Sequence, residues 1–375
     1  MRKIEMVDLK QQYNRLKIQI DSSIQECLEN SIFIKGSQVT SFQKNLESYL
    51  NVSHVIPCAN GTDALQIAMM ALGLKVGDEV IVPTFTYVAT AEVIGLLGLV
   101  PVLVDVNPDT FNIDTECIDK AITDKTRLIV PVHLFGQCAD METIMQIAKK
   151  YNLFVIEDTA QAIGSKYTFA DGTSKMAGTI GDIGTTSFFP SKNLGCYGDG
   201  GAILTNNEEL ATKLKIIANH GQAKQYYHDV IGVNSRLDSI QAGVLNVKLP
   251  YLDAFNEARQ NVAHHYDNTF KSFSDVIIPY RDVNSTHVFH QYTLKIKSGR
   301  RDDLKKYLYD KGIPSMIYYP LPLHHQKAYE SISKKSGKLN ISENLCNEVI
   351  SLPMHTEFEE EQLNYITQHI INYFN

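Results

Sequence analysis

Lys192 is the residue of this chain whose surroundings most favour covalent chemistry. It lies in the run SFFPSKNLGCYGDGG (187–201), between two segments with the apolar pattern of buried strands, 182–189 and 198–205. An ammonium group held between buried strands must be paired, neutralised or converted to an imine. The local pattern leaves two interpretations open, a functional lysine and an ordinary surface lysine that ends a strand.

Asp158 is the second candidate, because it ends the segment LFVIED (153–158), which is otherwise mostly apolar. Its carboxylate needs a partner, either a helix N-terminus or the protonated ring nitrogen of a pyridine cofactor. A lysine and a carboxylate are the pair that pyridoxal phosphate requires. The lysine holds the aldehyde as an imine, and the carboxylate keeps the ring nitrogen protonated. Ser187, shortly before Lys192 in the chain, is placed to add a hydroxyl to a phosphate site.

Two other strand ends are followed by groups that could bind a ligand. The turn ANGTD (59–63) leads into a helical pattern, which points free N–H groups and the positive end of a helix at an anion. An ordinary turn with Thr62 or Asp63 as the helix N-cap is the alternative. In TFTY (84–87), an aromatic ring could stack on a flat ligand or fill the core.

These candidates follow the strands of a predicted α/β sheet. Ligands bind beyond the carboxyl ends of strands in such sheets, so the candidates are expected to gather at one edge. The predicted strands are HVIPC (54–58), EVIVP (79–83), VPVLVDV (100–106), RLIVPVHL (127–134) and LFVIED (153–158). Amphipathic segments between them predict helices, and the strands are rich in Val, Ile and Leu as in mostly parallel sheets.

The second half of the chain has a different pattern. A long helical run over 236–270 is expected to link two domains. Beyond it, 287–297 alternates like a half-exposed strand, and 342–353 has a helical pattern. We predict a large domain over residues 1–250, including an N-terminal helical segment, and a small α+β domain over 251–375.

Composition indicates a globular protein and excludes several classes. Of 375 residues, 44% are hydrophobic and 21% charged, and no apolar run is long enough for a membrane span. The N-terminus lacks the apolar core of a signal peptide, so we expect a cytoplasmic protein. A net charge of -7 without a basic tract argues against nucleic acid as a partner. The six cysteines form no C-x-x-C pair and the histidines have no metal-binding spacing, so no metal site is expected.

Six segments together resemble the sugar-nucleotide aminotransferases of the DegT/DnrJ/EryC1/StrS family. In order, they are CANGTDAL (58–65), PTFTYVATAE (83–92), LFGQCAD (134–140), VIEDTAQAIG (155–164), SFFPSKNLGCYGDGGAI (187–203) and GVNSRLDSIQA (232–242). Each motif is loose, but together and in this order they are specific. The resemblance implies an α/β fold of type I, as in aspartate aminotransferase, with pyridoxal 5′-phosphate as cofactor. It also implies a homodimer with the active site at the subunit interface.

The resemblance further implies a role for each matching residue. Lys192 would be the Schiff-base lysine and Asp158 the partner of the pyridine nitrogen. The other implied cofactor contacts are Gln161 near the ring hydroxyl, Tyr87 stacked on the ring, Gly61, Thr62 and Ser187 at the phosphate, and Asn234 reaching the phosphate from the other subunit. A monomer would then lack a complete site.

The implied reaction has two stages. L-glutamate gives its amino group to the cofactor, and the cofactor passes it to a nucleotide-linked keto-sugar, with Lys192 as the general base. The motifs most resemble aminotransferases acting on UDP-2-acetamido-2-deoxy-3-oxo-glucuronate, on a route to bacterial surface polysaccharides. A dTDP-linked 3-oxo-6-deoxyhexose, or a 4-keto-sugar, is the alternative. Arg236 could bind the uronate carboxylate, although arginine at this position is frequent in the family whatever the sugar.

The segment IYYPLPLHHQKAY (317–329) resembles the family's substrate-side stretch. It implies that Tyr319 and His324 lie near the sugar or the diphosphate. Tyr318 stands where the 3-oxo-uronate enzymes tend to carry a histidine, so the identity of the sugar stays open.

Two other functional classes compete with the aminotransferase. A sugar dehydratase of this family has a histidine in place of Lys192, and a cofactor-binding regulator would have no activity. The presence of both Lys192 and Asp158 favours the aminotransferase, because a regulator has no chemical need for the pair.

Overall fold

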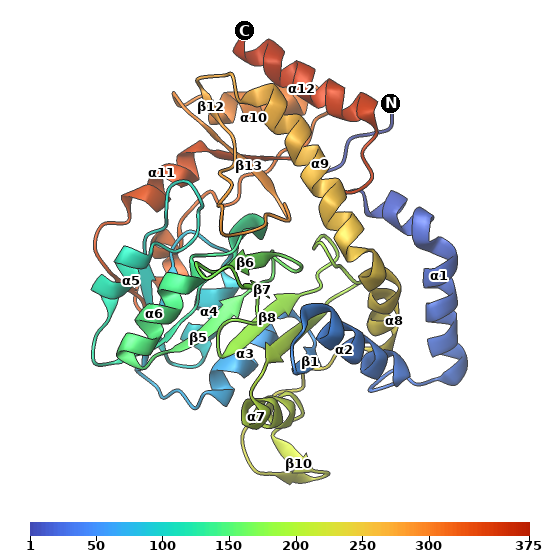
Figure 1. The fold of residues 1–375 in the computed structure, drawn as a ribbon, viewed down its shortest axis with the longest axis vertical. Coiled ribbons are helices and arrows are strands. Elements are labelled where there is room, and N and C mark those ends of the chain that lie inside the picture. Colours follow the sequence, from blue (N-terminus) through green and yellow to red (C-terminus); the bar gives the residue numbers. More distant parts are fainter.

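The computed structural model describes all residues from Met1 to Asn375. An eight-stranded sheet with helices on both faces forms most of the molecule, and a unit of helices and a three-stranded sheet lies at one end (Figure 1). Both termini are in this second unit, at the top of the view. None of the helices combines the length and the hydropathy that a membrane crossing requires.

The central sheet is mostly parallel, as predicted. Its strands, in spatial order, are β1 (His54–Cys58), β9 (Gly201–Thr205), β8 (Ile183–Ser187), β5 (Phe154–Asp158), β4 (Thr126–Ile129), β2 (Glu79–Pro83), β3 (Val100–Val104) and β14 (Lys334–Lys335). Strand β9 alone is reversed, pairing antiparallel with both β1 and β8. Every residue of β2 and β9 is buried, which explains their continuous apolar runs.

Two layers of helices cover the sheet. Helices α3 (Gly61–Ala71), α4 (Ala89–Leu96) and α7 (Glu208–Ala218) contribute to a buried cluster of 28 residues on one face. Helices α5 (Thr115–Ala121) and α6 (Met141–Tyr151) contribute to a separate cluster of 18 on the other. Helices α3, α5, α6 and α7 each begin after an Asn or Asp whose side chain accepts an N–H of the first turn.

The N-terminal segment and the predicted linking helix pack together. Helices α1 (Leu9–Asn30) and α2 (Ser37–Leu50) both lie against α8 (Ser239–Lys248) (Figure 1). The long helical run predicted over 236–270 is in fact two helices, because a short 3-10 turn at Leu249–Tyr251 separates α8 from α9 (Leu252–Phe270). Pro250 accounts for the break, since its ring removes a backbone N–H from the helix interior.

The C-terminal unit has its own core. Strands β12 (Val276–Ile277), β13 (Tyr292–Ile296) and β15 (Val349–Leu352) form an antiparallel sheet that packs with α9, α10 (Arg301–Asp310) and α12 (Glu360–Phe374) around 18 buried residues. Helix α11 (Asn340–Glu348) leads into β15. Ile4 from the N-terminal end also belongs to this core. The predicted boundary near residue 250 stays a proposal.

Two predictions for this unit were wrong. The segment 287–297 was expected to be a half-exposed strand, but all of β13 is buried. One face lies in the C-terminal core, while Lys295 on the other reaches the carbonyl of Pro108 at 2.7 Å. The segment 342–353 was expected to be helical throughout, but its last part is β15. Pairing with β13 overrides the local helical pattern there.

Candidate active site

Lys192 lies in a tight turn after β8, which ends at Ser187. The Lys192 N–H donates a hydrogen bond of 2.8 Å to the carbonyl of Phe189, which folds the turn back on itself. At Gly195, a Cβ would lie 2.3 Å from the carbonyl oxygen of Pro190, so the turn requires glycine at this point. The turn therefore holds the lysine beside the carboxyl end of the sheet.

Two side chains of helix α8 form hydrogen bonds with the backbone of this turn. The ammonium of Lys248 donates a hydrogen bond of 2.7 Å to the carbonyl of Gly195. The side chain of Gln241 both accepts from the backbone N–H of Tyr197 and donates to its carbonyl, at 2.8 and 3.1 Å. Lys248 is fully buried, and desolvation lowers its pKa to about 8. Lys248 was not among the residues predicted from the sequence, because a lysine in the last turn of a helix has no unusual local signal.

Asp158 ends the neighbouring strand β5 and is only 7% exposed. Its Oδ1 accepts the N–H of Ala160 at 3.1 Å, and its Oδ2 accepts the hydroxyl of Thr90 at 3.0 Å. Desolvation raises the pKa of Asp158, against the opposing effects of the Ala160 N–H, the Lys192 charge and the Thr90 hydroxyl. A carboxylate so deeply buried is stabilised by a cationic partner, and a protonated pyridine nitrogen is such a partner.

Lys192 and Asp158 act on each other electrostatically. Desolvation lowers the pKa of Lys192 to about 8, and the nearby charge of Asp158 opposes this shift. Part of the Lys192 population is therefore the neutral amine near neutral pH, which is the form that can attack an aldehyde. Both members of the predicted pair are thus brought to the same sheet edge, in environments that fit pyridoxal phosphate.

Residues predicted to bind the phosphate lie together, and their role stays a prediction. Gly61, at the start of α3, lies so close to Ser187 that an added Cβ would be 2.8 Å from the serine Cβ. The helix is capped by Asn60, whose side chain accepts the N–H of Asp63, and not by Thr62 or Asp63 as the alternative supposed. The N–H groups of Gly61 and Thr62 have no acceptor within the protein. These donors, the positive end of the helix and the Ser187 hydroxyl fit a phosphate group.

Tyr319 contacts two of the predicted cofactor residues, Gln161 and Tyr87. Gln161 is fixed at both ends of its amide, since its Oε1 accepts the N–H of Phe135 at 2.8 Å and its Nε2 donates to the Tyr319 hydroxyl at 3.1 Å. The Tyr87 ring is 58% exposed, with its centroid 6.4 Å from that of Tyr319. An exposed ring at this position has a free face on which a flat ligand can stack.

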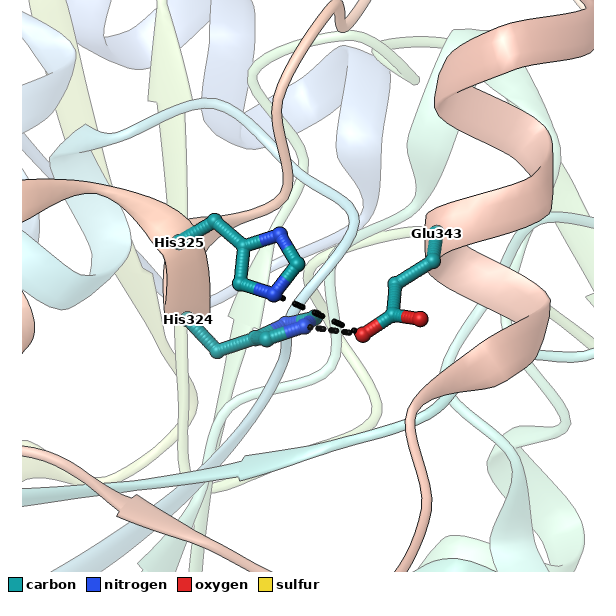
Figure 2. Close-up of side chains that lie close together, drawn as sticks. All are labelled: His324, His325 and Glu343. Carbon is teal, nitrogen blue, oxygen red and sulfur yellow. Dashed lines mark hydrogen bonds and ion pairs between the residues drawn. The ribbon is translucent and has the colours of Figure 1, made fainter.

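Both ring nitrogens of His324 have hydrogen-bond partners within the protein. Figure 2 shows the Nε2 atoms of His324 and His325 converging on Oε1 of Glu343, at 3.1 and 3.5 Å. The other ring nitrogen of His324 lies 2.8 Å from the hydroxyl of Thr84. Direct substrate contact by His324 therefore stays a prediction that this geometry does not favour, because both ring nitrogens are occupied.

The hydrogen bonds of this cluster account for the ring proton of His324. Burial lowers the pKa of His324, which keeps the ring neutral with one proton. The Thr84 hydroxyl has no acceptor other than Nδ1 of His324, so it donates there and leaves the ring proton on Nε2, facing Glu343. A metal ion could bind Nε2 only by displacing this proton. As it stands, the cluster ties the segment containing Tyr319 to α11.

Asn234 and Arg236 are not brought to the site of their own chain. Asn234 is exposed and forms a β-bridge with Asn219 at the end of α7. Arg236 lines an open pocket of about 350 Å³ whose walls include Lys35 and Lys215 but neither Lys192 nor Asp158. The role predicted for these two residues in the site of another subunit stays a prediction.

A half-buried lysine and a buried carboxylate beside a helix N-terminus, at the carboxyl ends of parallel strands, define a pyridoxal-phosphate-dependent α/β transferase. The sequence model of the DegT/DnrJ/EryC1/StrS aminotransferase family matches residues 14–371, and the chain belongs to this family. The protein is accordingly a transaminase with pyridoxal phosphate as its cofactor.

Individual relatives match the whole chain. A protein described as a pleiotropic regulatory protein, from Geobacillus stearothermophilus, is 45% identical over 99% of this chain and 98% of its own length. The UDP-2-acetamido-2-deoxy-3-oxo-D-glucuronate aminotransferase of Pseudomonas aeruginosa is 44% identical over 98% of this chain and 100% of its own. The crystal structure of NtdA from Bacillus subtilis with bound cofactor PMP is 33% identical, with a TM-score of 0.91 over 100% of this chain and 86% of NtdA. The predicted fold, family and cofactor are confirmed.

Proposed function

We propose that this enzyme transfers the amino group of L-glutamate to C3 of UDP-2-acetamido-2-deoxy-3-oxo-glucuronate. The observation that carries the aminotransferase chemistry is the pairing of Lys192 with Asp158 beside the Gly61 helix end. The choice of sugar rests on the similarity to the Pseudomonas aeruginosa enzyme over the full length of both chains. A dTDP-linked 3-oxo-6-deoxyhexose is the alternative acceptor, because relatives acting on dTDP-linked sugars also match nearly the whole chain. The predicted cytoplasmic location remains part of this proposal.

In this function, Lys192 carries the cofactor and later moves a proton. Bound pyridoxal phosphate supplies an aldehyde that takes up the amino group and a ring that withdraws electrons from the carbon being deprotonated. Lys192, once released, accepts the proton from the donor carbon as a general base. A pKa of about 8 suits this task, because a base works best with a pKa near the operating pH. Asp158 keeps a proton on the ring nitrogen, and Gly61, Thr62 and Ser187 hold the phosphate.

We further propose that the working unit is a homodimer in which Asn234 and Arg236 complete the partner's site. The pocket lined by Arg236 also contains Lys35 and Lys215 and has no carboxylate in its walls, which favours an anionic occupant. Immediately before Lys35, three large apolar side chains in a row are exposed: Ile32, Phe33 and Ile34. Such a patch is typical of a surface that another protein covers. The anionic group is the diphosphate or uronate carboxylate of the substrate.

The acceptor can be identified by assaying the reverse reaction with 2-oxoglutarate and a panel of amino sugars. The panel contains a UDP-linked 3-amino uronate, the matching UDP sugar without the carboxylate, and dTDP-linked 3-amino and 4-amino 6-deoxyhexoses. We expect the UDP uronate to have the highest kcat/KM. A preference for either dTDP sugar would replace the proposed acceptor with the alternative. Equal turnover of the two UDP sugars would remove the role proposed for Arg236.

A further inference from the structure

We propose that Thr90 is a positioning residue that holds the Asp158 carboxylate in the orientation and charge state needed by the cofactor ring. This inference rests on the role proposed for Asp158. The Thr90 hydroxyl donates to Oδ2 of Asp158 at 3.0 Å across a separation of 68 residues in the chain. Both side chains are buried, with Thr90 only 1% exposed.

The bond is the only one that the Thr90 hydroxyl makes within the protein. Thr90 lies in the first turn of α4, where a threonine hydroxyl commonly bonds to a carbonyl one turn back, but no such bond is present. Its neighbours on the helix, Ala89, Ala91 and Val93, are buried and apolar. A hydroxyl in this setting needs a polar partner, and Asp158 is the partner that the fold provides.

The hydrogen bond fixes the carboxylate at a second point. Oδ1 is held by the N–H of Ala160, so the two oxygens are attached to two different elements, the segment after β5 and the start of α4. Rotation of the carboxyl group about the Cβ–Cγ bond of Asp158 would break at least one of these two hydrogen bonds. Each oxygen still has a lone pair free for a ring N–H, because a carboxylate oxygen accepts about two hydrogen bonds.

Thr90 also stabilises the negative charge of Asp158 when Lys192 cannot. Burial raises the pKa of Asp158, and the Lys192 ammonium is one of the groups opposing that shift. That contribution disappears when Lys192 is neutral, as it must be to react with an aldehyde. The Ala160 N–H and the Thr90 hydroxyl remain, since neither loses its proton.

The test compares Thr90→Val, which keeps the branched shape and removes the hydroxyl, with Thr90→Ser, which keeps the hydroxyl. The measurements are the dissociation constant of pyridoxal phosphate from the apoenzyme, the pH titration of the bound cofactor's absorbance, and the rate at which L-glutamate converts it. For Thr90→Val we expect the rate to fall about tenfold or more, as for a lost hydrogen bond to a charged group, with weaker binding and a shifted titration. Thr90→Ser should restore all three to within about threefold, since the donor is retained.

Thr367→Val is the matched control for a purely structural loss. Its buried hydroxyl bonds to the carbonyl of Leu363 within α12, so the variant should lose some thermal stability and keep wild-type cofactor binding. Wild-type titration and rate in Thr90→Val, or a defect that Thr90→Ser does not repair, would overturn the inference. The variant Asp158→Asn tests the proposed function independently of Thr90. If Asp158→Asn slows the reaction and Thr90→Val does not, the role of Thr90 is contradicted while the role of Asp158 stands.

Discussion

The Lys248 ammonium reaches the carbonyl of Gly195 at 2.7 Å, inside the turn that carries Lys192. A second lysine thus supports the first, from a position 53 residues beyond Gly195 in the chain. The Lys248 ammonium also lies 4.4 Å from the centroid of the Tyr197 ring, which adds a cation–π contact. The reactive turn is therefore held by a buried cation that does not itself take part in the chemistry.

Lys248→Met should loosen this turn. The substitution leaves the Gly195 carbonyl buried without a partner, at a cost of about 1–3 kcal/mol, partly offset because a desolvated charge is also removed. We expect weaker cofactor binding and faster proteolysis of the 189–198 turn, with secondary structure retained. Lys248→Arg keeps a donor and should show a smaller effect. Limited proteolysis and cofactor titration measure both, and unchanged cofactor binding in Lys248→Met would contradict the supporting role.

Asp158→Asn should preserve the fold and abolish most of the reaction. Asparagine has the same shape but carries no negative charge, so it cannot keep a proton on the pyridine nitrogen. We expect the glutamate half-reaction to slow by about a hundredfold or more, as for loss of an electrostatic group at a reacting centre. Stopped-flow absorbance measures the rate. Asp114→Asn, at the cap of α5, is the control and should react normally.

The depressed pKa of Lys192 predicts a pH-dependent stability in the cofactor-free protein. A lysine with a folded pKa of about 8 binds fewer protons when folded than when unfolded between that pH and its ordinary pKa of 10.5. Stability from this group therefore rises with pH across this window. Below about pH 8, Lys192→Met should be more stable than the wild type, because it removes a desolvated charge. The advantage should shrink toward pH 10 in thermal unfolding of the apoproteins. An advantage that does not vary with pH would contradict the depressed pKa.

Much of the fold could be predicted because its signals are local. Strands inside the central sheet, such as β2 and β9, are apolar runs buried on both faces. The five predicted strands overlap β1 to β5, although β4 ends at Ile129 and the prediction extended to residue 134. The errors arise where distant segments decide the outcome. β15 follows a helical pattern but pairs with β13, and β13 alternates in sequence but is covered by residues near Pro108.

The residues of the site also form two groups, those with a local signal in the sequence and those without one. Lys192 and Asp158 could be recognised because each is a charge in an apolar context, and the family motifs specify their roles. Thr90 and Lys248 could not, because what distinguishes them is a partner 68 or 53 residues away. A threonine in a helix or a lysine near a helix end has no unusual local signal. The hydrogen bonds that occupy both ring nitrogens of His324 were likewise invisible in the sequence.

A shared active site predicts complementation between two inactive variants. Lys192→Ala and Asn234→Ala should each be inactive or nearly so as homodimers. When the two are mixed, unfolded together and refolded, heterodimers gain one site with both wild-type residues, so activity should return. The same experiment with Lys192→Ala and Asp158→Asn should give no recovery, because both residues belong to one chain's site. Failure of the first pair to complement would contradict the exchange of Asn234 between subunits.

The identity of the lysine that binds the cofactor is the central claim, and borohydride reduction of the holoenzyme followed by peptide mass spectrometry tests it most directly. We predict that the reduced pyridoxyl group is found on Lys192 alone, and that adding L-glutamate before the reductant removes the label. Lys248 is the informative comparison, since its pKa is also lowered to about 8. A label on Lys248 or any other lysine, or a label on Lys192 that glutamate leaves unchanged, would contradict the account.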